Sequence, residues 1–377
     1  MSGQNALLQY FPKLSEQDRP KALFNAFLLF LAFTVAGVGI LWGLRGSFFE
    51  YFNNQQELPY FELLCWYTLL NTPAFLIHIF YLLLKKYKLI LWWGAFTFGG
   101  QLLAVVLPIL FGYSLQMTFW ALFALAGIRI GWTLLLLMRH GECIVDIKFI
   151  KKYVWLVLPL MLHVLIGNSV EYIDGLIVQA NFSDKGAFAV FRFGARELPI
   201  SLLFVGAVIA ALIPQVSQNQ EQGLQLIKQK TDELSRWLYP LSILLMLLSP
   251  LLFPIFYSEE FAESAYIFNV YLLMLSSRIL MPQIIIMSHQ KNFILVNSAI
   301  IETLINVGLS LLLVKYYGLI GIAFASVIAY LIDKLILIIY NALVLKIPVQ
   351  HYTSLKKYFF YNTLLVGSFF LTQMLYK

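Results

Sequence analysis

Charge is scarce in this sequence. Only 12% of its 377 residues are charged and 60% are hydrophobic, whereas soluble domains carry roughly 25% charged residues. Cysteine is also rare: Cys65 falls in an apolar stretch and Cys143 in a basic connector, so no disulfide between them and no metal site is expected. Residues 1–21 are polar and lack the apolar core of a cleavable signal peptide. These features exclude a water-soluble domain and redox chemistry.

Enzyme motifs are missing as well. The sequence has no glycine-rich phosphate loop followed by Lys and Ser or Thr, so ATP hydrolysis is not expected. Outside the apolar stretches, His140 and Asp146 lie close in sequence, but nothing places a nucleophile beside a base. We therefore predict no catalytic residue and no cofactor. Transport would have to use an ion gradient or the membrane potential.

Long apolar stretches dominate the rest of the chain. A bilayer core about 30 Å thick needs about 20 apolar residues per helix, and eleven stretches meet that length. The predicted fold class is all-α, a polytopic membrane protein with about eleven transmembrane helices. The expected helices are 22–44, 60–84, 89–112, 116–138, 153–178, 186–214, 237–257, 264–287, 293–314, 318–342 and 356–376.

Basic residues are distributed unevenly between the two sets of connectors. One set, with the N-terminal segment, holds most Lys and Arg residues outside the apolar stretches, whereas the opposite set holds only Arg45, Lys185 and Lys315. By the positive-inside rule the N-terminus is expected to be cytoplasmic. Topology thus explains the net charge of +7, and no nucleic-acid partner is needed. The polar stretch 215–236 is either a cytoplasmic surface helix or a solvated loop.

Ionisable residues at membrane depth are functional candidates, because each is costly there unless it pairs or meets water. His163, Glu171 and Asp174 share one face of helix 153–178. Glu171 and Arg192 both lie roughly 10 Å inside the outer boundary, so they are expected to pair. Arg196 is then a second cation for which this pairing leaves no carboxylate. The residue after it, Glu197, is acidic.

A second set of ionisable residues is expected on the cytoplasmic side of the membrane. Arg278 and Glu302 each lie roughly 13 Å from the cytoplasmic ends of their helices and form a second expected pair. Asp333 and Lys334 occupy a similar level, and Arg129 is a cation with no acid at its depth on a neighbouring helix. Either these charges are neutralised pairs that hold helices in register, or they line a hydrated cavity for an anionic cargo. Arg129 either contacts phosphate or pairs with a carboxylate of the other half. Prolines within the apolar stretches suggest kinks at Pro73, Pro108, Pro159, Pro199, Pro250, Pro254 and Pro282.

Four segments resemble the Wzx-type oligosaccharide-lipid flippases, whose superfamily also contains multidrug and toxin exporters and lipid II flippases. Ala6–Phe30 is similar to the connector into that family's third helix, and Gly186–Gln218 to its eighth helix. Phe256–Val314 resembles the region of the ninth to eleventh helices, and Gly318–Tyr330 the twelfth. The resemblance implies a fold of two six-helix lobes around a cavity that opens alternately to each side.

The resemblance also implies a function and a site. It implies translocation of a polyprenyl-pyrophosphate-linked oligosaccharide for surface polysaccharide or lipopolysaccharide assembly, with membrane lipids, a polysaccharide polymerase and glycosyltransferases as partners. Four cations fit a pyrophosphate-binding role by depth and chemistry: Arg129, Arg192, Arg196 and Arg278. The candidates for ion coupling or ion pairing are His163, Glu171, Asp174, Glu197, Glu302, Asp333 and Lys334.

The same resemblance sets the expected organisation. A cytoplasmic segment (1–21) precedes an N-terminal lobe of four helices (22–138), a cytoplasmic linker (139–152), a C-terminal lobe of six helices (153–342) and a last connector and helix (343–377). Connectors containing Gly112 and Gly318 suggest a repeat between the lobes. The N-terminal lobe lacks two helices of the family pattern. Either in-frame codons upstream of Met1 encode them, or another subunit completes the lobe.

Two other functions stay open. A cation-coupled multidrug exporter of the same superfamily would use Glu171 or Asp174 as its proton or sodium site. A membrane-embedded glycan polymerase or acyltransferase would be favoured by one long outer loop carrying Arg or His. The longest such loop here, about 45–59, contains one Arg.

Overall fold

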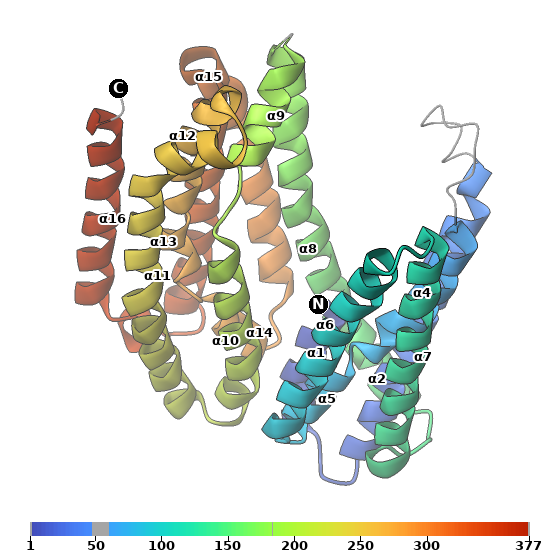
Figure 1. Cartoon of the computed structure of the whole chain (residues 1–377). Helices are drawn as coiled ribbons and strands as arrows, with labels where there is room; N and C mark the ends of the chain where they lie inside the picture. The colour runs from blue at the N-terminus through green and yellow to red at the C-terminus, as the bar shows by residue number, and fades with distance from the viewer. Residues whose placement is uncertain (1, 47–59, 183, 376–377) are drawn as a thin grey trace. The chain divides into compact units, whose positions relative to one another are not determined.

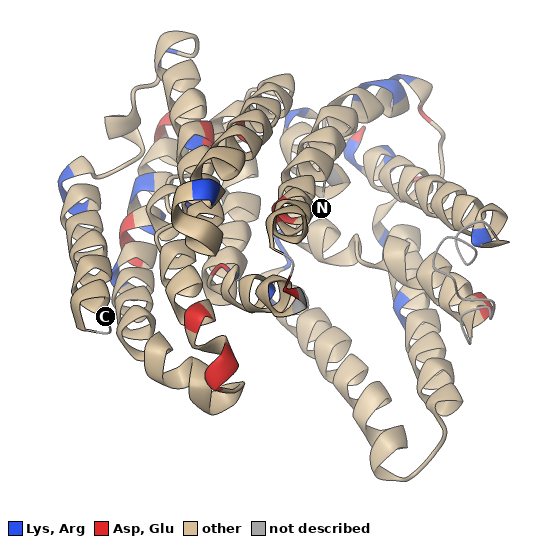
Figure 2. Ribbon diagram, turned by 90° about the horizontal axis from the view of Figure 1, so that it is seen from above, with Lys and Arg blue, Asp and Glu red and all other residues tan. Residues whose placement is uncertain are grey.

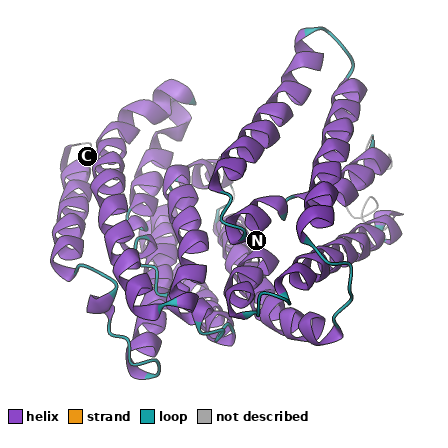
Figure 3. Cartoon of the chain, turned by 90° about the horizontal axis from the view of Figure 1, so that it is seen from below, coloured by secondary structure: helices purple, strands orange, loops and turns teal. Residues whose placement is uncertain are grey.

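The computed structural model describes residues 2–46, 60–182 and 184–375. All regular elements in these residues are helices (Figure 3). Residues divide into two compact units, unit 1 ending at Trp155 and unit 2 beginning at Leu156. The longest predicted outer loop falls largely on residues 47–59, which lie outside the described residues.

Unit 1 is built on four long apolar elements (Figure 1). Its helices are α1 (Ser2–Tyr10), η1 (Phe11–Lys13), α2 (Arg19–Gly43), α4 (Phe61–Ala74), α5 (Ile77–Leu83), α6 (Tyr87–Leu110), α7 (Leu115–His140) and the start of α8 (Ile147–Asn181). Helix α7 packs on α4 and α6, and α2 packs on α4. Part of the polar N-terminal segment is helical: α1 buries Ala6, Leu7 and Leu8, and Gly3 O accepts a bond from Tyr153 Oη at 2.7 Å.

Unit 2 continues α8 and adds the remaining helices. They are α9 (Lys185–Gly194), α10 (Pro199–Gln218), α11 (Gln220–Phe256), η2 (Glu259–Phe261), α12 (Ala262–Leu272), α13 (Leu275–Arg278), α14 (Gln283–Ser288), α15 (Phe293–Leu343), η3 (Val349–His351) and α16 (Leu355–Leu375). Helix α11 packs against α10, α12 and α16. Most of the stretch 215–236 is helical: residues 215–218 end α10, the extended Asn219 caps the next helix, and the polar first half of α11 continues without a break into its apolar half.

Each of the eleven expected stretches contains helix, and within the part of the chain that the structure describes eight helices are long and apolar enough to cross a membrane. Stretch 264–287 is divided among α12, α13 and α14, so no single helix spans it. Three breaks fall at predicted prolines, near Pro73, Pro199 and Pro282. The other four predicted prolines lie inside continuous helices, at Pro108, Pro159, Pro250 and Pro254.

The two units repeat one pattern of turns. Helix α5 ends in a left-handed residue, Lys85 (φ 58°), and the amide of Lys86 donates five residues back at 2.8 Å. Helix α14 ends likewise in Gln290 (φ 59°), and the amide of Lys291 donates five residues back at 3.1 Å. Both turns therefore close the helix with the bonding of a Schellman motif.

Glycine closes the next turn in each unit. Gly112 (φ 71°) joins α6 to α7, and Gly318 (φ 59°, ψ −140°) interrupts α15. A side chain at Gly318 would be strained, because glycine is nearly alone in tolerating such backbone angles. The predicted pair of glycine connectors is confirmed, and the matching order of turns supports an internal repeat.

Candidate functional site

Most of the charged residues expected at membrane depth in unit 2 fall into two groups. Most of the ribbon in both units carries no charge (Figure 2). The Glu171 cluster consists of Glu171, Arg192 and Arg196. The Tyr330 cluster consists of His163, Glu197, Arg278, Glu302, Tyr330, Asp333 and Lys334.

The Glu171 cluster joins α8 to the break between α9 and α10. Arg192 Nη1 donates a hydrogen bond to Glu171 Oε1, and Arg196 Nη1 lies 3.8 Å from the same oxygen. The predicted pairing of Glu171 with Arg192 is confirmed. All three side chains remain partly exposed. Two cations share one carboxylate, so the cluster carries one surplus positive charge.

The Tyr330 cluster contains a two-point ion pair. Arg278 Nε donates to Glu197 Oε2 at 2.9 Å, and Arg278 Nη2 donates to the other carboxylate oxygen. The predicted pair of Arg278 with Glu302 is therefore wrong. Glu197 lies in the non-helical segment 195–198 before Pro199, and this break brings its carboxylate to α13. Paired geometry of this kind is the strong form of an Arg–carboxylate contact.

Tyr330 lies between two cations. The Arg278 guanidinium lies 4.2 Å from the centroid of the Tyr330 ring, and Lys334 Nζ lies 4.5 Å from it. Both distances suit cation–π attraction. Lys334 Nζ also donates to Asp333 Oδ2 at 2.9 Å, and both of those side chains are buried. The aromatic ring thus links the two ion pairs.

Glu302 and His163 complete the Tyr330 cluster. Glu302 interacts electrostatically with Asp333, Lys334, Arg278 and Glu197. His163 Nδ1 lies 2.9 Å from the carbonyl oxygen of Leu295, and its charged neighbours are Lys334 and Asp333. The cluster contains three carboxyl groups and, besides His163, two cations, which form ion pairs with Glu197 and Asp333. Glu302 is therefore an acid in excess of these two ion pairs, whereas the Glu171 cluster has a cation in excess.

Asp174 occupies a third polar site in unit 2. Its side chain is buried, and Ser326 Oγ donates to Asp174 Oδ2 at 2.7 Å. Ser310 Oγ lies 3.5 Å from Asp174 Oδ1, and Asn306 Nδ2 donates to Ser326 Oγ at 3.0 Å. Among the described residues, no cation lies within 4.0 Å of this carboxylate. Hydroxyl groups, and no cation, hold Asp174 in place.

The sequence analysis missed several partners in unit 2, although their spacing was visible. Ser326, Tyr330 and Lys334 are each four residues apart, so they lie on one face of α15. Asn306 and Ser310 have the same spacing on the first half of α15. Polar residues four apart inside an apolar stretch were the signal for the Asp174 site and for Tyr330.

Arg129 belongs to unit 1, where its side chain is surrounded by polar neighbours. Its side chain is fully buried, and its guanidinium donates to Asn71 Oδ1 at 2.6 Å, Thr97 O at 2.5 Å and Gln101 Oε1 at 3.4 Å. The ring of Phe75 lies 5.7 Å away. Neutral acceptors in unit 1 thus satisfy much of the Arg129 guanidinium, and its contact with cargo stays a prediction.

Chemically, the arrangement is suited to binding ions. Among the described residues, no group of three or more His, Cys, Asp or Glu side chains could hold a metal ion. The Glu171 cluster offers surplus positive charge to an anion. Asp174 offers a carboxylate to a proton or small cation.

Solved structures with this architecture are membrane transporters. A multidrug resistance MATE family transporter of the MOP superfamily, in an outward-facing conformation, matches with a TM-score of 0.74 and 12% identity over 92% of this chain and 83% of that one. The Vibrio cholerae MATE transporter VcmN in the bent form gives 0.71 and 10% identity over 98% and 85%. Lipid II flippase MurJ in an inward closed conformation gives 0.55 and 17% identity over 99% and 86%. The chain is thus a polytopic membrane protein with a MATE-like fold.

The family follows from the sequence model for lipid II flippase MurJ, which matches residues 76–376. That match covers most of the chain, so the chain belongs to the lipid II flippase MurJ family. No curated protein matches the sequence significantly. The superfamily expected from the sequence is confirmed, and the chain is a membrane flippase or exporter.

The first prediction concerns the bond between Glu197 and Arg278. Glu197→Gln should lower the unfolding temperature in detergent, because it leaves the partly buried Arg278 charge without its partner. The double variant E197Q/R278Q should recover much of that loss, with a coupling free energy of about 1–3 kcal/mol in a double-mutant cycle. The matched cycle of Glu302 with Arg278 should give a smaller coupling free energy, since Glu302 interacts with Arg278 electrostatically but makes no ion pair with it. Strictly additive effects of E197Q and R278Q would contradict the pairing.

Proposed function

We propose that this protein is a flippase that moves a polyprenyl-pyrophosphate-linked saccharide from the cytoplasmic to the outer leaflet of a bacterial inner membrane. The family match over residues 76–376 carries the proposal. Two cargoes of this class are candidates: lipid II, named in the family description, and a Wzx-type oligosaccharide for surface polysaccharide assembly. For the second cargo, a polysaccharide polymerase and glycosyltransferases would be the protein partners.

We assign the contact with the cargo pyrophosphate to Arg192 and Arg196. Guanidinium groups bind phosphate oxygens through paired, charge-assisted hydrogen bonds. Arg196 lies 3.8 Å from the Glu171 oxygen that already accepts a hydrogen bond from Arg192. The N–H donors of Arg196 are therefore more available to the cargo than those of Arg192. Arg278 is held by two bonds to Glu197, which makes it a weaker candidate. The surplus positive charge of the Glu171 cluster supports this assignment.

Charge removal from the Glu171 cluster tests the flippase. In liposomes containing labelled lipid II or labelled oligosaccharide-linked lipid, R192Q/R196Q should slow flipping of the preferred cargo by about tenfold or more, since each lost charged hydrogen bond is worth about 1.5–3 kcal/mol. Arg236→Gln, which removes an exposed arginine outside the cluster, should leave the rate unchanged.

A further variant separates folding from transport. E171Q/R192Q/R196Q removes the stranded carboxylate together with both cations, so it should fold as the wild type does and still fail to flip. Flipping at the wild-type rate by this folded variant would refute the assignment to Arg192 and Arg196. If the wild-type protein moved neither labelled lipid, the flippase proposal itself would fail.

A second candidate function is cation-coupled export of small molecules. The observation that favours it is Asp174, a buried carboxylate surrounded by the hydroxyl groups of Ser310 and Ser326. Such a carboxylate can take up a proton or Na⁺ and release it when the surroundings change. Coupling of this kind would also be able to drive a flippase, so the cargo decides between the two functions.

Asp174→Asn tests the coupling role. The amide keeps the size of the side chain and loses the charge, so gradient-driven transport should fall about tenfold while cargo binding is retained. Asp184→Asn is the matched control, because Asp184 caps α9 by accepting from the amide of Gly186 at 2.9 Å and Asn caps helices equally well. Unchanged gradient-driven transport by D174N would exclude Asp174 as the coupling site. Resistance to cationic dyes that depends on Asp174, without lipid flipping, would favour the exporter.

The orientation is part of the proposal. The asymmetry of Lys and Arg supports a cytoplasmic N-terminus, which puts the exposed thiol of Cys143 on the cytoplasmic side. A membrane-impermeant thiol reagent should therefore label Cys143 in inside-out vesicles and leave it unlabelled in intact spheroplasts, with Cys143→Ser as the control. Labelling from the outside would reverse the topology.

A further inference from the structure

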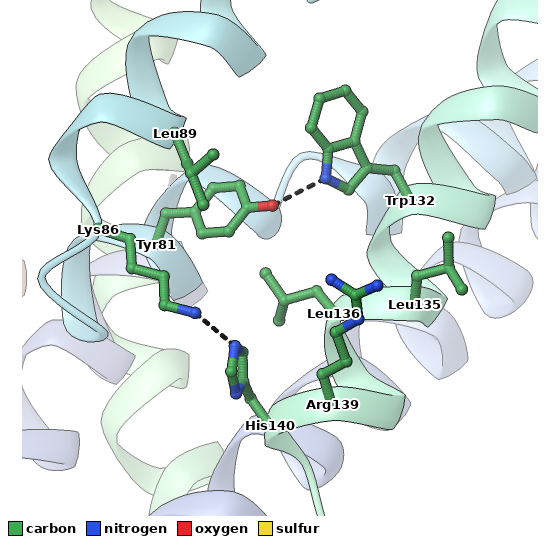
Figure 4. A pocket seen from close by; sticks show the side chains of 8 residues that line it. All are labelled: Tyr81, Lys86, Leu89, Trp132, Leu135, Leu136, Arg139 and His140. Atoms are coloured by element: carbon green, nitrogen blue, oxygen red, sulfur yellow. Dashed lines mark hydrogen bonds between the residues drawn. The ribbon is translucent and has the colours of Figure 1, made fainter.

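A small basic pocket lies within unit 1, where α5, α6 and α7 meet. It has a volume of about 210 Å³. Its lining combines cations, aromatic rings and leucines: Tyr81, Lys86, Leu89, Trp132, Leu135, Leu136, Arg139 and His140. Figure 4 shows the Lys86 and Arg139 side chains approaching the pocket from opposite walls. No acidic side chain lines it.

The cations of this pocket have spare hydrogen-bond donors. Lys86 Nζ lies 2.6 Å from His140 Nε2, and because an ammonium group can only donate, that nitrogen accepts and His140 is neutral. Among the described residues, neither Lys86 nor Arg139 has a carboxylate within 4.0 Å. The Arg139 guanidinium offers five donors and Lys86 two more. An anion with several oxygen atoms would satisfy them.

The fold holds these groups in position before any ligand arrives. The left-handed backbone of Lys85 ends α5 and sets the direction of Lys86. Trp132 Nε1 donates to Tyr81 Oη at 2.8 Å, and the Trp132 ring meets that of Trp93 edge-on at 5.2 Å. This packing fixes one aromatic wall of the pocket. Ordered walls lower the entropic cost of binding.

We propose that this pocket binds the phosphate headgroup of an anionic phospholipid, a function beyond the flipping of cargo. Phosphate groups occur in lipid headgroups, in the cargo and as free inorganic phosphate. The residues that line the pocket favour the lipid headgroup. Leu89, Leu135 and Leu136 continue the wall next to the cations, so acyl chains and headgroup contact one continuous surface. Basic pockets between transmembrane helices at the cytoplasmic end are typical headgroup sites, and Trp and Tyr are enriched at that depth.

The test uses full-length protein in a zwitterionic detergent with phosphatidylglycerol as the probe and phosphatidylcholine, which is zwitterionic and has no net charge, as the comparison. Bound lipid is measured by native mass spectrometry. K86Q/R139Q should weaken phosphatidylglycerol binding about tenfold or more, the value expected when a charged hydrogen bond is lost. Phosphatidylcholine binding should not change.

A matched variant controls for overall charge. K85Q/K88Q removes two cations from the same turn that do not line the pocket, and it should bind within about twofold of wild type. Gln at position 85 suits the left-handed turn, because Gln290 occupies the corresponding place in unit 2. Equal weakening by both double variants would overturn the proposal. If K86Q/R139Q fails to fold, R139Q alone decides, and unchanged binding by R139Q would overturn it.

Competition separates the sources of phosphate. Inorganic phosphate at millimolar concentration and undecaprenyl pyrophosphate should each leave the bound phosphatidylglycerol in place. Displacement by inorganic phosphate would make the pocket a site for soluble anions. Displacement by undecaprenyl pyrophosphate at or below the phospholipid concentration would make it part of the cargo path. Either displacement would overturn the assignment to phospholipid and leave the proposed flippase activity standing.

Discussion

An ionised side chain within a hydrocarbon layer must find a partner inside the protein, and this constraint orders the interior of both units. Lipid supplies neither water nor counter-charge, so an unsatisfied charge costs several kcal/mol. Unit 1 meets the demand for Arg129 with neutral oxygens from Asn71, Thr97 and Gln101. Unit 2 meets it by joining opposite charges around Tyr330. Buried charge is thus satisfied by neutral acceptors in unit 1 and by ion pairs in unit 2, and the ion pairs bring ionisable acids and bases together inside unit 2.

The helix breaks of unit 2 follow from the same constraint. An unwound segment frees backbone groups that lipid cannot satisfy, so each break needs polar neighbours. The break before Pro199 carries Glu197 to Arg278. The break at 279–282 has its Pro282 carbonyl capped by Asn341 Nδ2 at 3.0 Å. Both helix breaks therefore lie beside polar side chains. The break before Pro199 also brings the Glu197 carboxylate to Arg278, a position that it would not reach from a straight helix.

Sequence reasoning succeeded where one-dimensional periodicity was sufficient. The apolar stretches located the helices, and the depth of Glu171 and Arg192 along their helices predicted their pairing. It failed for Arg278, because counting residues gives depth along a helix and does not give the direction in which a break turns Glu197. It did not anticipate the partners of Arg129 within unit 1, since Asn71 and Gln101 are neutral and carry no electrostatic signal. The four-residue spacing of Ser326, Tyr330 and Lys334 was present and would have identified the polar face of α15.

The acid and the cation in excess of the ion pairs of unit 2 bear on how transport would be driven. Moving a net charge across the membrane potential costs about 2.3 kcal/mol per charge per 100 mV, and a pyrophosphate carries more than one. A surplus cation in the Glu171 cluster offsets part of the cargo charge, while surplus acid in the Tyr330 cluster and at Asp174 can hold a proton or Na⁺. Because Ser326 donates to Asp174 and Tyr330 lies four residues further along the same helix face, movement of α15 would affect both acidic sites together. Asp174 also lies three residues from Glu171 on α8, so movement of α8 would link ion release at Asp174 to cargo release at the Glu171 cluster without direct contact between the two ligands.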